Sequence, residues 1–400
     1  MDVPEADPGK ANGEALARRL DIARGLLEQP TAPMKEVLPQ EYIRNFVRQR
    51  PELRLAEDSA GNLIVRYTSQ GAAAQPPLVL VAHLDHPAFW IDRISSDAVE
   101  MTFKGFVSIP HARVGTRVRF FEVGRREPTG TGELMEVGET EKHLSRGLAR
   151  IQSGHAVEGG FAMWDFPGFS LSESFIITRC CDDLLGAAAA LCTLDEIARL
   201  KPPDVNLWAL FTRAEEIGFL GALEAVRLKT LPRNSCVLSL ECSKAAGIAP
   251  QGEGVAVRVG DRSSIFDPNL SEALRLSAEA VRKADPQFKY QRKLMDGGTC
   301  EATVFCAYGY RSSGLALPLG NYHNQAMGKD GPEIGPENVM VSDFVSEIRL
   351  LTELAQKPQL LEKSVVKAPE WLQQRARMAQ VELGTRKKSR KRSAQRGESL

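Results

Sequence analysis

The sequence predicts an α/β fold in which a mainly parallel sheet is sandwiched by helices and a small β-barrel domain is inserted. Three observations predict it. Short apolar runs alternate with helical patterns through most of the chain, and such alternation is typical of a parallel sheet. A central stretch alternates apolar and polar residues without a long helical pattern. The length of 400 residues suggests a large domain plus an insertion.

The first elements precede the central stretch. Leucine, isoleucine and alanine recur at helical spacing over residues 14–28, which predicts a helix there, and a second helix is expected around 39–48. Residues 63–67 read as a strand after Asn62. The apolar run 78–82 is predicted to be the buried strand beside it.

The central stretch is predicted to be the inserted β-domain. Segments such as 99–104 and 117–123 alternate apolar and polar residues, and turn-rich pieces separate them. This alternation of apolar and polar residues favours a small β-barrel or β-sandwich, and of the two we expect the barrel.

Helices and strands then alternate again. An alanine-rich segment after Asp182 has high helix propensity. The further predicted strands are 205–211, 236–240 and 315–319, and the further predicted helices are 218–228, 271–283 and 341–355. We therefore expect one catalytic α/β domain in two parts, 1–93 and 173–357, around a β-domain at 94–172, with a C-terminal extension at 358–400.

Composition excludes several classes of protein. Lysine and arginine number 51, as do aspartate and glutamate, so the overall charge implies neither a nucleic-acid nor a membrane partner. The amino terminus lacks the pattern of a signal peptide, and the apolar runs are too short to span a bilayer. Seven cysteines without a C-x-x-C motif predict reduced thiols and a cytoplasmic protein.

The basic run Arg386–Arg392 lies near the carboxyl end. It is interpreted as a solvated, disordered tail, and contact with nucleic acid or an acidic partner is the alternative. Residues 370–383 before it could form a helix.

Metal-ligand-type side chains follow the predicted strands, which suggests a metal centre. His83 and Asp85 end the first apolar run, and residues two apart in a strand point to the same side, so Asp85 can orient the His83 ring. Asp182 lies where a strand passes into a helix. Asp182 or Asp183 could cap that helix, while Asp182 is also suited to bridge two metals.

Three more donors follow later strands. The pair Glu215-Glu216 lies between a buried strand and Gly218, Glu241 follows the run 236–240, and His323 follows 315–319. Adjacent carboxylates can divide their roles, because a general base cannot also be tied up as a ligand. Two histidines and several carboxylates at one sheet edge suit a pair of divalent metals. Among the other histidines, His86 is the likeliest to touch substrate.

Taken in their order along the chain, these donor residues resemble the ligands of the co-catalytic di-zinc aminopeptidases. Within that group, they are most similar to the tetrahedral or deblocking family, which includes glutamyl aminopeptidases. The motifs that carry the resemblance are His83-x-Asp85, Asp182-Asp183-x-x-Gly186, Glu215-Glu216-x-Gly218, Glu241 and His323, with the glycine loop Gly297-Gly298-Thr299. The β-domain lies between His-x-Asp and the bridging aspartate, as in that family.

The resemblance implies a role for each donor. His83, Asp182 and Glu241 would hold one metal, and Asp182, Glu216 and His323 the other. Glu215 would be the general base and Asp85 would orient His83. The metals would be two divalent ions per chain, expected to be zinc, although cobalt or manganese also suit these ligands.

The chain departs from the family's usual residues at four places. His86-Pro87-Ala88 stands where Glu-x-Gly is usual, Leu184 where arginine is usual, Glu241 where aspartate is common, and Cys300-Glu301 where Asp-Ala is usual. The ligand types survive these changes. Substrate preference and assembly are the properties that they affect.

The predicted function is hydrolysis of amino-terminal residues from peptides by a two-metal-activated water. The predicted partners are the peptide substrate and further copies of the chain, bound through the β-domain. Two alternatives stay open. One is a di-metal hydrolase of another amide, such as an N-acyl amino acid or a dipeptide, and the other is a non-catalytic metal-binding paralogue.

Overall fold

The computed structural model describes residues 8–245, 247, 249–362 and 370–382. Its centre is a nine-stranded mixed sheet in the order β1-β2-β12-β3-β13-β17-β15-β16, with β14 paired to β17. This confirms the predicted α/β class. The strands of the sheet are β1 (Arg54–Glu57), β2 (Leu63–Thr68), β3 (Leu78–His83), β12 (Asn206–Thr212), β13 (Cys236–Ser239), β14 (Cys242–Lys244), β15 (Val255–Asp261), β16 (Tyr290–Met295) and β17 (Arg311–Leu319).

The middle of the sheet is parallel. Strand β3 pairs in parallel with β12 on one side and β13 on the other, and β13 pairs in parallel with β17. Their carboxyl ends therefore meet at one edge of the sheet. Antiparallel pairs occur toward the sides of the sheet, between β1 and β2, β2 and β12, and β15 and β17.

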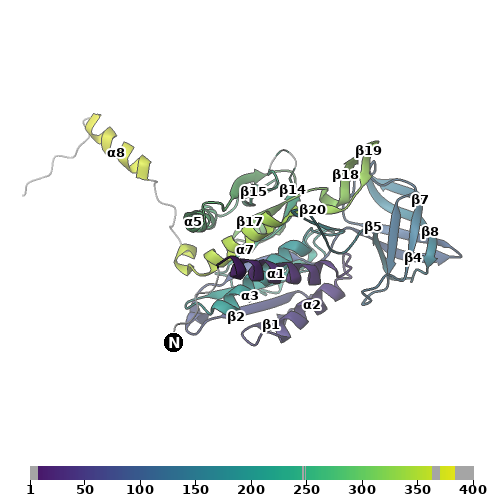
Figure 1. Ribbon diagram of the computed structural model, residues 1–400, viewed down its shortest axis with the longest axis horizontal. Helices are drawn as coiled ribbons and strands as arrows, with labels where there is room; N and C mark the ends of the chain where they lie inside the picture. Colours follow the sequence, from purple (N-terminus) through teal and green to yellow (C-terminus); the bar gives the residue numbers. More distant parts are fainter. Residues whose placement is uncertain (1–7, 246, 248, 363–369, 383–400) are drawn as a thin grey trace, which may run out of the picture.

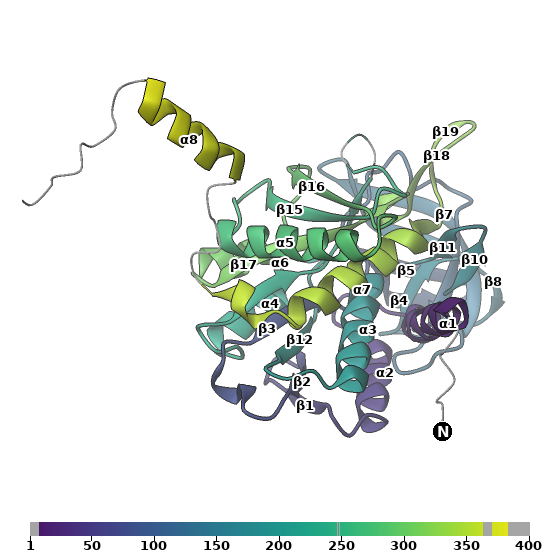
Figure 2. The same cartoon turned by 60° about the vertical axis from the view of Figure 1, so that its left-hand side comes forward.

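Helices cover both faces of the sheet, as Figures 1 and 2 show. On one face Leu78 and Leu80 of β3 pack with α1, α3, α5 and α7, while Val79 and Val81 face a second core with α4 and α6. Such alternation buries both sides of the strand. The helices are α1 (Pro8–Leu27), α2 (Val37–Arg48), α3 (Leu184–Leu200), α4 (Leu220–Arg227), α5 (Pro268–Ala284), α6 (Glu301–Ala307) and α7 (Val341–Ala355).

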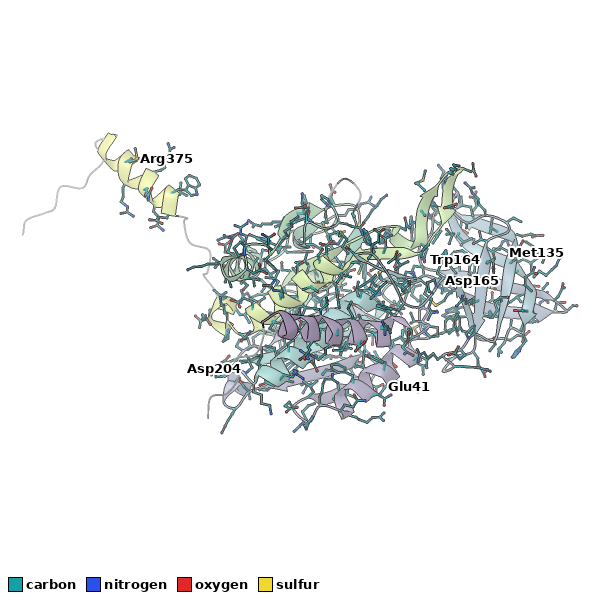
Figure 3. The ribbon with its side chains drawn as sticks, viewed as in Figure 1. Glu41, Met135, Trp164, Asp165, Asp204 and Arg375 are labelled. Atoms are coloured by element: carbon teal, nitrogen blue, oxygen red, sulfur yellow. The ribbon has the colours of Figure 1, made fainter. Side chains whose placement is uncertain are left out.

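The inserted domain is a closed antiparallel barrel in the order β4-β5-β8-β7-β6-β9. Its strands are β4 (Ala88–Ser95), β5 (Ala98–Lys104), β6 (Arg117–Phe121), β7 (Gly130–Thr140), β8 (His143–Gly154) and β9 (Phe161–Trp164). The barrel has its own core around Phe89, Phe120 and Trp164, and Figure 3 labels Trp164 there. The predicted inserted β-barrel is confirmed, and the domain boundaries stay predictions.

Five short strands belong to neither the large sheet nor the barrel. Strands β10 (Ser170–Ser172), β11 (Phe175–Thr178) and β20 (Glu337–Met340) form a small sheet, and β18 (Gln325–Gly328) pairs with β19 (Gly331–Ile334) in a hairpin. Single 3₁₀ turns lie at η1 (Ala72–Ala74), η2 (Tyr322–Asn324) and η3 (Pro358–Leu361).

Helix α8 (Glu370–Glu382) stands apart from the remaining structure in Figures 1 and 2. The predicted basic tail, Arg386–Arg392, lies outside the described residues. None of the described helices combines the length and apolar character that crossing a bilayer requires. All seven cysteines are free, as expected for reduced thiols.

Candidate metal centre

The donors expected from the sequence gather at the carboxyl edge of the parallel strands. Strand β3 ends at His83, Glu241 comes two residues after β13, and His323 comes four residues after β17. Asp182 lies just before α3. They line one cavity of about 150 Å³, whose wall includes His83, Asp182, Glu215, Glu241, His323, Cys242, Lys244, Arg258, Tyr322 and Gly297–Cys300.

Asp182 lies between the two histidines. Its Oδ1 is 3.6 Å from His83 Nε2, and its Oδ2 is 3.4 Å from His323 Nε2. The side chain is buried, and Oδ1 has no hydrogen-bond partner among the described residues. One carboxylate oxygen is thus directed toward each imidazole, which is the arrangement that a bridging metal ligand needs.

The two glutamates after β12 lie on different sides of Asp182. Glu216 Oε1 is 3.1 Å from His323 Nε2, whereas Glu215 Oε2 is 3.9 Å from His83 Nε2. Possible ligand atoms of His83, Asp182 and Glu216 lie within 4.8 Å of one another. Glu215 and Glu241 line the same cavity but belong to no such cluster among the described residues.

Both histidine rings are fixed by their other nitrogen. His83 Nδ1 contacts the main-chain oxygen of Asp85 at 3.1 Å and its carboxylate at 3.5 Å, while His323 Nδ1 lies 2.8 Å from the main-chain oxygen of Phe106. Such contacts leave Nε2 free to face a metal. The role expected of Asp85 is therefore shared between its carbonyl and its carboxylate.

Several carboxylates are buried close together in the centre. Burial raises the pKa of Glu215 well above its usual value, and Glu216 and Glu241 add to this effect. Burial also raises the pKa of Glu241, to about 7. For His83, burial alone would lower the pKa, but the carboxylates of Glu215, Asp182 and Asp85 hold it well above the usual value. Cations would relieve this accumulation of buried carboxylates.

Buried carboxylates that the sequence analysis did not identify hold the centre in place. Glu337 accepts hydrogen bonds from the main-chain N–H groups of Cys181 (2.6 Å), Asp182 (3.1 Å) and His323 (2.8 Å). Glu36 accepts from the N–H of Ala214 at 3.0 Å. Neither glutamate lies in a strand-end pattern that could have indicated its role.

His86 is not a substrate contact in this structure. It is fully buried and does not line the cavity. Its Nδ1 lies 2.7 Å from the main-chain oxygen of Asp182, and its Nε2 lies 3.0 Å from Asn324 Oδ1. The ring therefore supports the Asp182 segment from behind.

The architecture is shared with solved aminopeptidases. An aminopeptidase from the archaeon Desulfurococcus kamchatkensis matches with a TM-score of 0.70 at 18% identity, over 88% of this chain and 99% of the other. A TET aminopeptidase from a marine-sediment thaumarchaeote matches with a TM-score of 0.67 at 17% identity, over 85% and 96%. The TET1 peptidase of Pyrococcus horikoshii matches with a TM-score of 0.66 at 18% identity, over 84% and 99%.

The fold, the His–carboxylate centre and the family match together define a metal-dependent aminopeptidase. The model of the M42 glutamyl aminopeptidase family matches residues 155–329, and the family resemblance predicted from the sequence is confirmed. A search of curated proteins finds no match.

Proposed function

We propose that the peptidase activity depends on two divalent ions, of which zinc is the first candidate and cobalt or manganese the alternatives. His83, Asp182 and Glu241 would hold one ion, and Asp182, Glu216 and His323 the other. The observation that carries the proposal is the placement of Asp182, whose two oxygens face different histidines at 3.6 and 3.4 Å. Imidazole and carboxylate are suitable ligands for all three metals.

When bound, the two ions would supply Lewis acidity, which would polarise the scissile carbonyl and acidify water. Glu215 is proposed as the general base that takes the proton of this water and passes it to the leaving amine. Two observations support that role. Its carboxylate lines the cavity 3.9 Å from His83 Nε2, and its raised pKa, caused first by burial, makes it a stronger base than an exposed glutamate.

Asp85 is proposed as a positioning residue. Its carboxylate oxygens accept hydrogen bonds from the main-chain N–H groups of Glu215 (2.9 Å) and Glu216 (3.1 Å), in addition to its contact with His83. One buried carboxylate thus fixes the relative position of a metal ligand, the base and a second ligand.

The substrate is proposed to be a peptide with a free amino terminus. Lys244 and Arg258 line the cavity, which favours an acidic side chain on the residue to be removed.

The TET1 peptidase of Pyrococcus horikoshii assembles into a tetrahedron or an octahedral shell. We infer that this chain also forms a homo-oligomer through the barrel, and light scattering tests this.

The test of the proposed function is the variant Glu215→Gln. We expect it to retain both metals, because Glu215 is not a ligand, and to lose activity by about 10²–10⁴-fold. The measurements are metal content and the rate of release of acidic, neutral and basic amino-terminal residues, with and without chelator. The matched control is Glu41→Gln, at an exposed glutamate of α2 that does not line the cavity and that Figure 3 labels.

Other outcomes would contradict particular parts of the proposal. Wild-type rates in Glu215→Gln would remove Glu215 from the mechanism. One metal per chain in the active enzyme would remove the bridging role of Asp182. Hydrolysis of N-acylated amino acids but not of free-amine peptides would favour the other amide hydrolase, and bound metal without hydrolysis of either would favour the non-catalytic paralogue.

A further inference from the structure

A second group of metal-ligand-type atoms lies directly beside the first. A carboxylate oxygen from each of Asp182 and Asp183 and the Sγ of Cys242 lie within 4.8 Å of one another, and all three residues are buried. This group shares only Asp182 with the cluster of His83, Asp182 and Glu216. The proposed two-metal centre does not use Asp183 or Cys242, so their chemistry needs a separate explanation.

Asp183 is a buried carboxylate without a partner. Its exposure is 0%, and neither side-chain oxygen has a hydrogen-bond partner among the described residues. It stands at the N-cap position of α3, but its side chain makes no capping hydrogen bond. The capping role that the sequence suggested for Asp183 is therefore wrong. An unpaired carboxylate in this environment is costly unless it gains a proton or a cation.

The absence of a side chain at Gly186 leaves space for the Asp183 carboxylate. A Cβ atom at Gly186 would lie 2.1 Å from Asp183 Oδ1, so only glycine permits the observed side-chain position. Gly186 is part of the motif that follows Asp182-Asp183. The position of the unpaired Asp183 oxygens therefore depends on Gly186, in the first turn of α3.

Cys242 supplies a sulfur atom to the same cluster. It follows Glu241, is 1% exposed and lines the cavity. Its thiol makes one long contact, 3.4 Å from Sγ to the main-chain oxygen of Cys181. Cys300 lines the same cavity at 2% exposure but belongs to no ligand cluster among the described residues. The two cysteines therefore form a natural pair for comparison.

We propose that Asp183 and Cys242, together with Asp182, form a further binding site for a thiophilic divalent cation beside the His–carboxylate centre. Zinc, cobalt and cadmium fit this chemistry, because thiolate and carboxylate are both good ligands for them. Cation binding releases the proton of the Cys242 thiol and the proton of the Asp183 carboxyl to solvent, so that both side chains bind as anions. Asp183 does not line the cavity, so we expect the ion to stabilise the junction of α3 and β14 rather than to bind the peptide.

The test is a cobalt titration of the full-length protein after metal removal, under reducing conditions. We expect the wild type to develop the near-ultraviolet charge-transfer absorption of a cobalt–thiolate bond. Cys242→Ser should lose this absorption and bind one cobalt ion fewer at saturation. Cys300→Ser, the matched control, should keep both the absorption and the stoichiometry.

A wild type without thiolate absorption at saturating cobalt would overturn the proposal, as would absorption that persists in Cys242→Ser. If Cys242→Ser fails to fold by circular dichroism, Asp183→Asn decides the question. It keeps the thiol and should weaken the affinity measured through the absorption by at least about tenfold. Unchanged affinity in Asp183→Asn would equally overturn the site.

The outcome is separable from that of the proposed function. Metal-dependent release of amino-terminal residues without any thiolate absorption would overturn only the further site. Thiolate absorption in a protein that releases no amino-terminal residue would overturn only the peptidase assignment.

Discussion

At the scale of single residues, the buried carboxylates in and around the centre differ in whether they have hydrogen-bond partners. Asp85, Glu36 and Glu337 accept main-chain hydrogen bonds around the centre, whereas Asp183 and Glu347 are fully buried without a partner among the described residues. The partnered carboxylates rigidify the site. The unpartnered ones depend on a proton or a cation, and their protonation therefore links stability to pH.

Glu347 gives a pH-dependent prediction. Burial alone raises its pKa well above the usual 4.5, so the folded protein keeps this proton to a higher pH than the unfolded chain. Above pH 4.5 the folded state binds more protons, and the free energy of unfolding falls as pH rises. Glu347→Gln cannot ionise, and we expect it to be about 1–3 kcal/mol more stable than the wild type at pH 8 and similar at pH 4.

The measurement is urea unfolding of the metal-free protein across this pH range. Glu353→Gln is the control, because Glu353 lies in the same helix but is 28% exposed and paired with Lys357. A gain in Glu347→Gln that does not change with pH would show that ionisation of Glu347 is not the cause.

The donors of the centre could be predicted from sequence because each follows an apolar run. His83, Glu241 and His323 stand at or just beyond the ends of β3, β13 and β17, and parallel strands bring such ends together. Glu337 and Glu36 could not be predicted in this way. Some of their partners lie more than 150 residues away along the chain, as for Glu337 with Cys181 and Glu36 with Ala214, and no local pattern marks such a contact.

At the scale of elements, strongly periodic segments were predictable and mixed ones were not. The predicted helix 341–355 coincides with α7, and the predicted strand 78–82 is one residue shorter than β3. Strands β15 and β16 and helix α6 were not predicted. Strand β16 reads Tyr-Gln-Arg-Lys-Leu-Met, of which only Met295 is buried, so its sequence lacks the apolar run of a buried strand.

The turn between β12 and α4 gives a prediction at this scale. A Cβ at Gly221 would lie 2.5 Å from the main-chain N and O of Arg213, in the segment that leads to Glu215. Gly221→Ala must displace this segment, and we expect a loss of about 1–3 kcal/mol of stability with lower kcat/KM. Gly13→Ala in α1, where a Cβ meets nothing within 4 Å, is the control.

Thermal unfolding and peptidase kinetics check this prediction. The activity loss in Gly221→Ala should exceed what its unfolded fraction explains, because the general base is moved. Full activity of the folded fraction would mean that the segment tolerates the added methyl group without moving Glu215.

At the scale of the whole molecule, the barrel and the sheet meet at the metal centre. The main-chain oxygen of Phe106, just beyond β5, accepts from His323 Nδ1 at 2.8 Å, and the carboxyl end of β3 runs through His86 and Pro87 into β4. The barrel thus contributes to the position of a proposed ligand. A change in the position of the barrel main chain at Phe106 should therefore alter the position of His323.

Gly105→Ala tests this coupling. Gly105 has φ +108°, and a Cβ there would lie 2.8 Å from Pro87 Cβ, so the substitution shifts the neighbouring Phe106 carbonyl. We expect the metal that Glu216 and His323 are proposed to hold to bind about 10–100-fold more weakly, with the other proposed site less affected. Competition with a chelator measures both affinities.

Gly124→Ala is the matched control, because Gly124 also lies in the barrel domain with a positive φ of +81° but a Cβ there meets nothing within 4 Å. Equal weakening of metal binding in both variants would mean that general destabilisation of the barrel, rather than the Phe106 carbonyl, is responsible.

The spacing of the donors along the chain also matters during synthesis. The chain emerges from the ribosome amino terminus first, and the proposed centre draws on residues from His83 to His323. The sheet follows the same order, because β3 must wait for its neighbours β12 and β13, and β13 must wait for β17. A nascent chain therefore cannot complete the proposed centre before His323 has been translated.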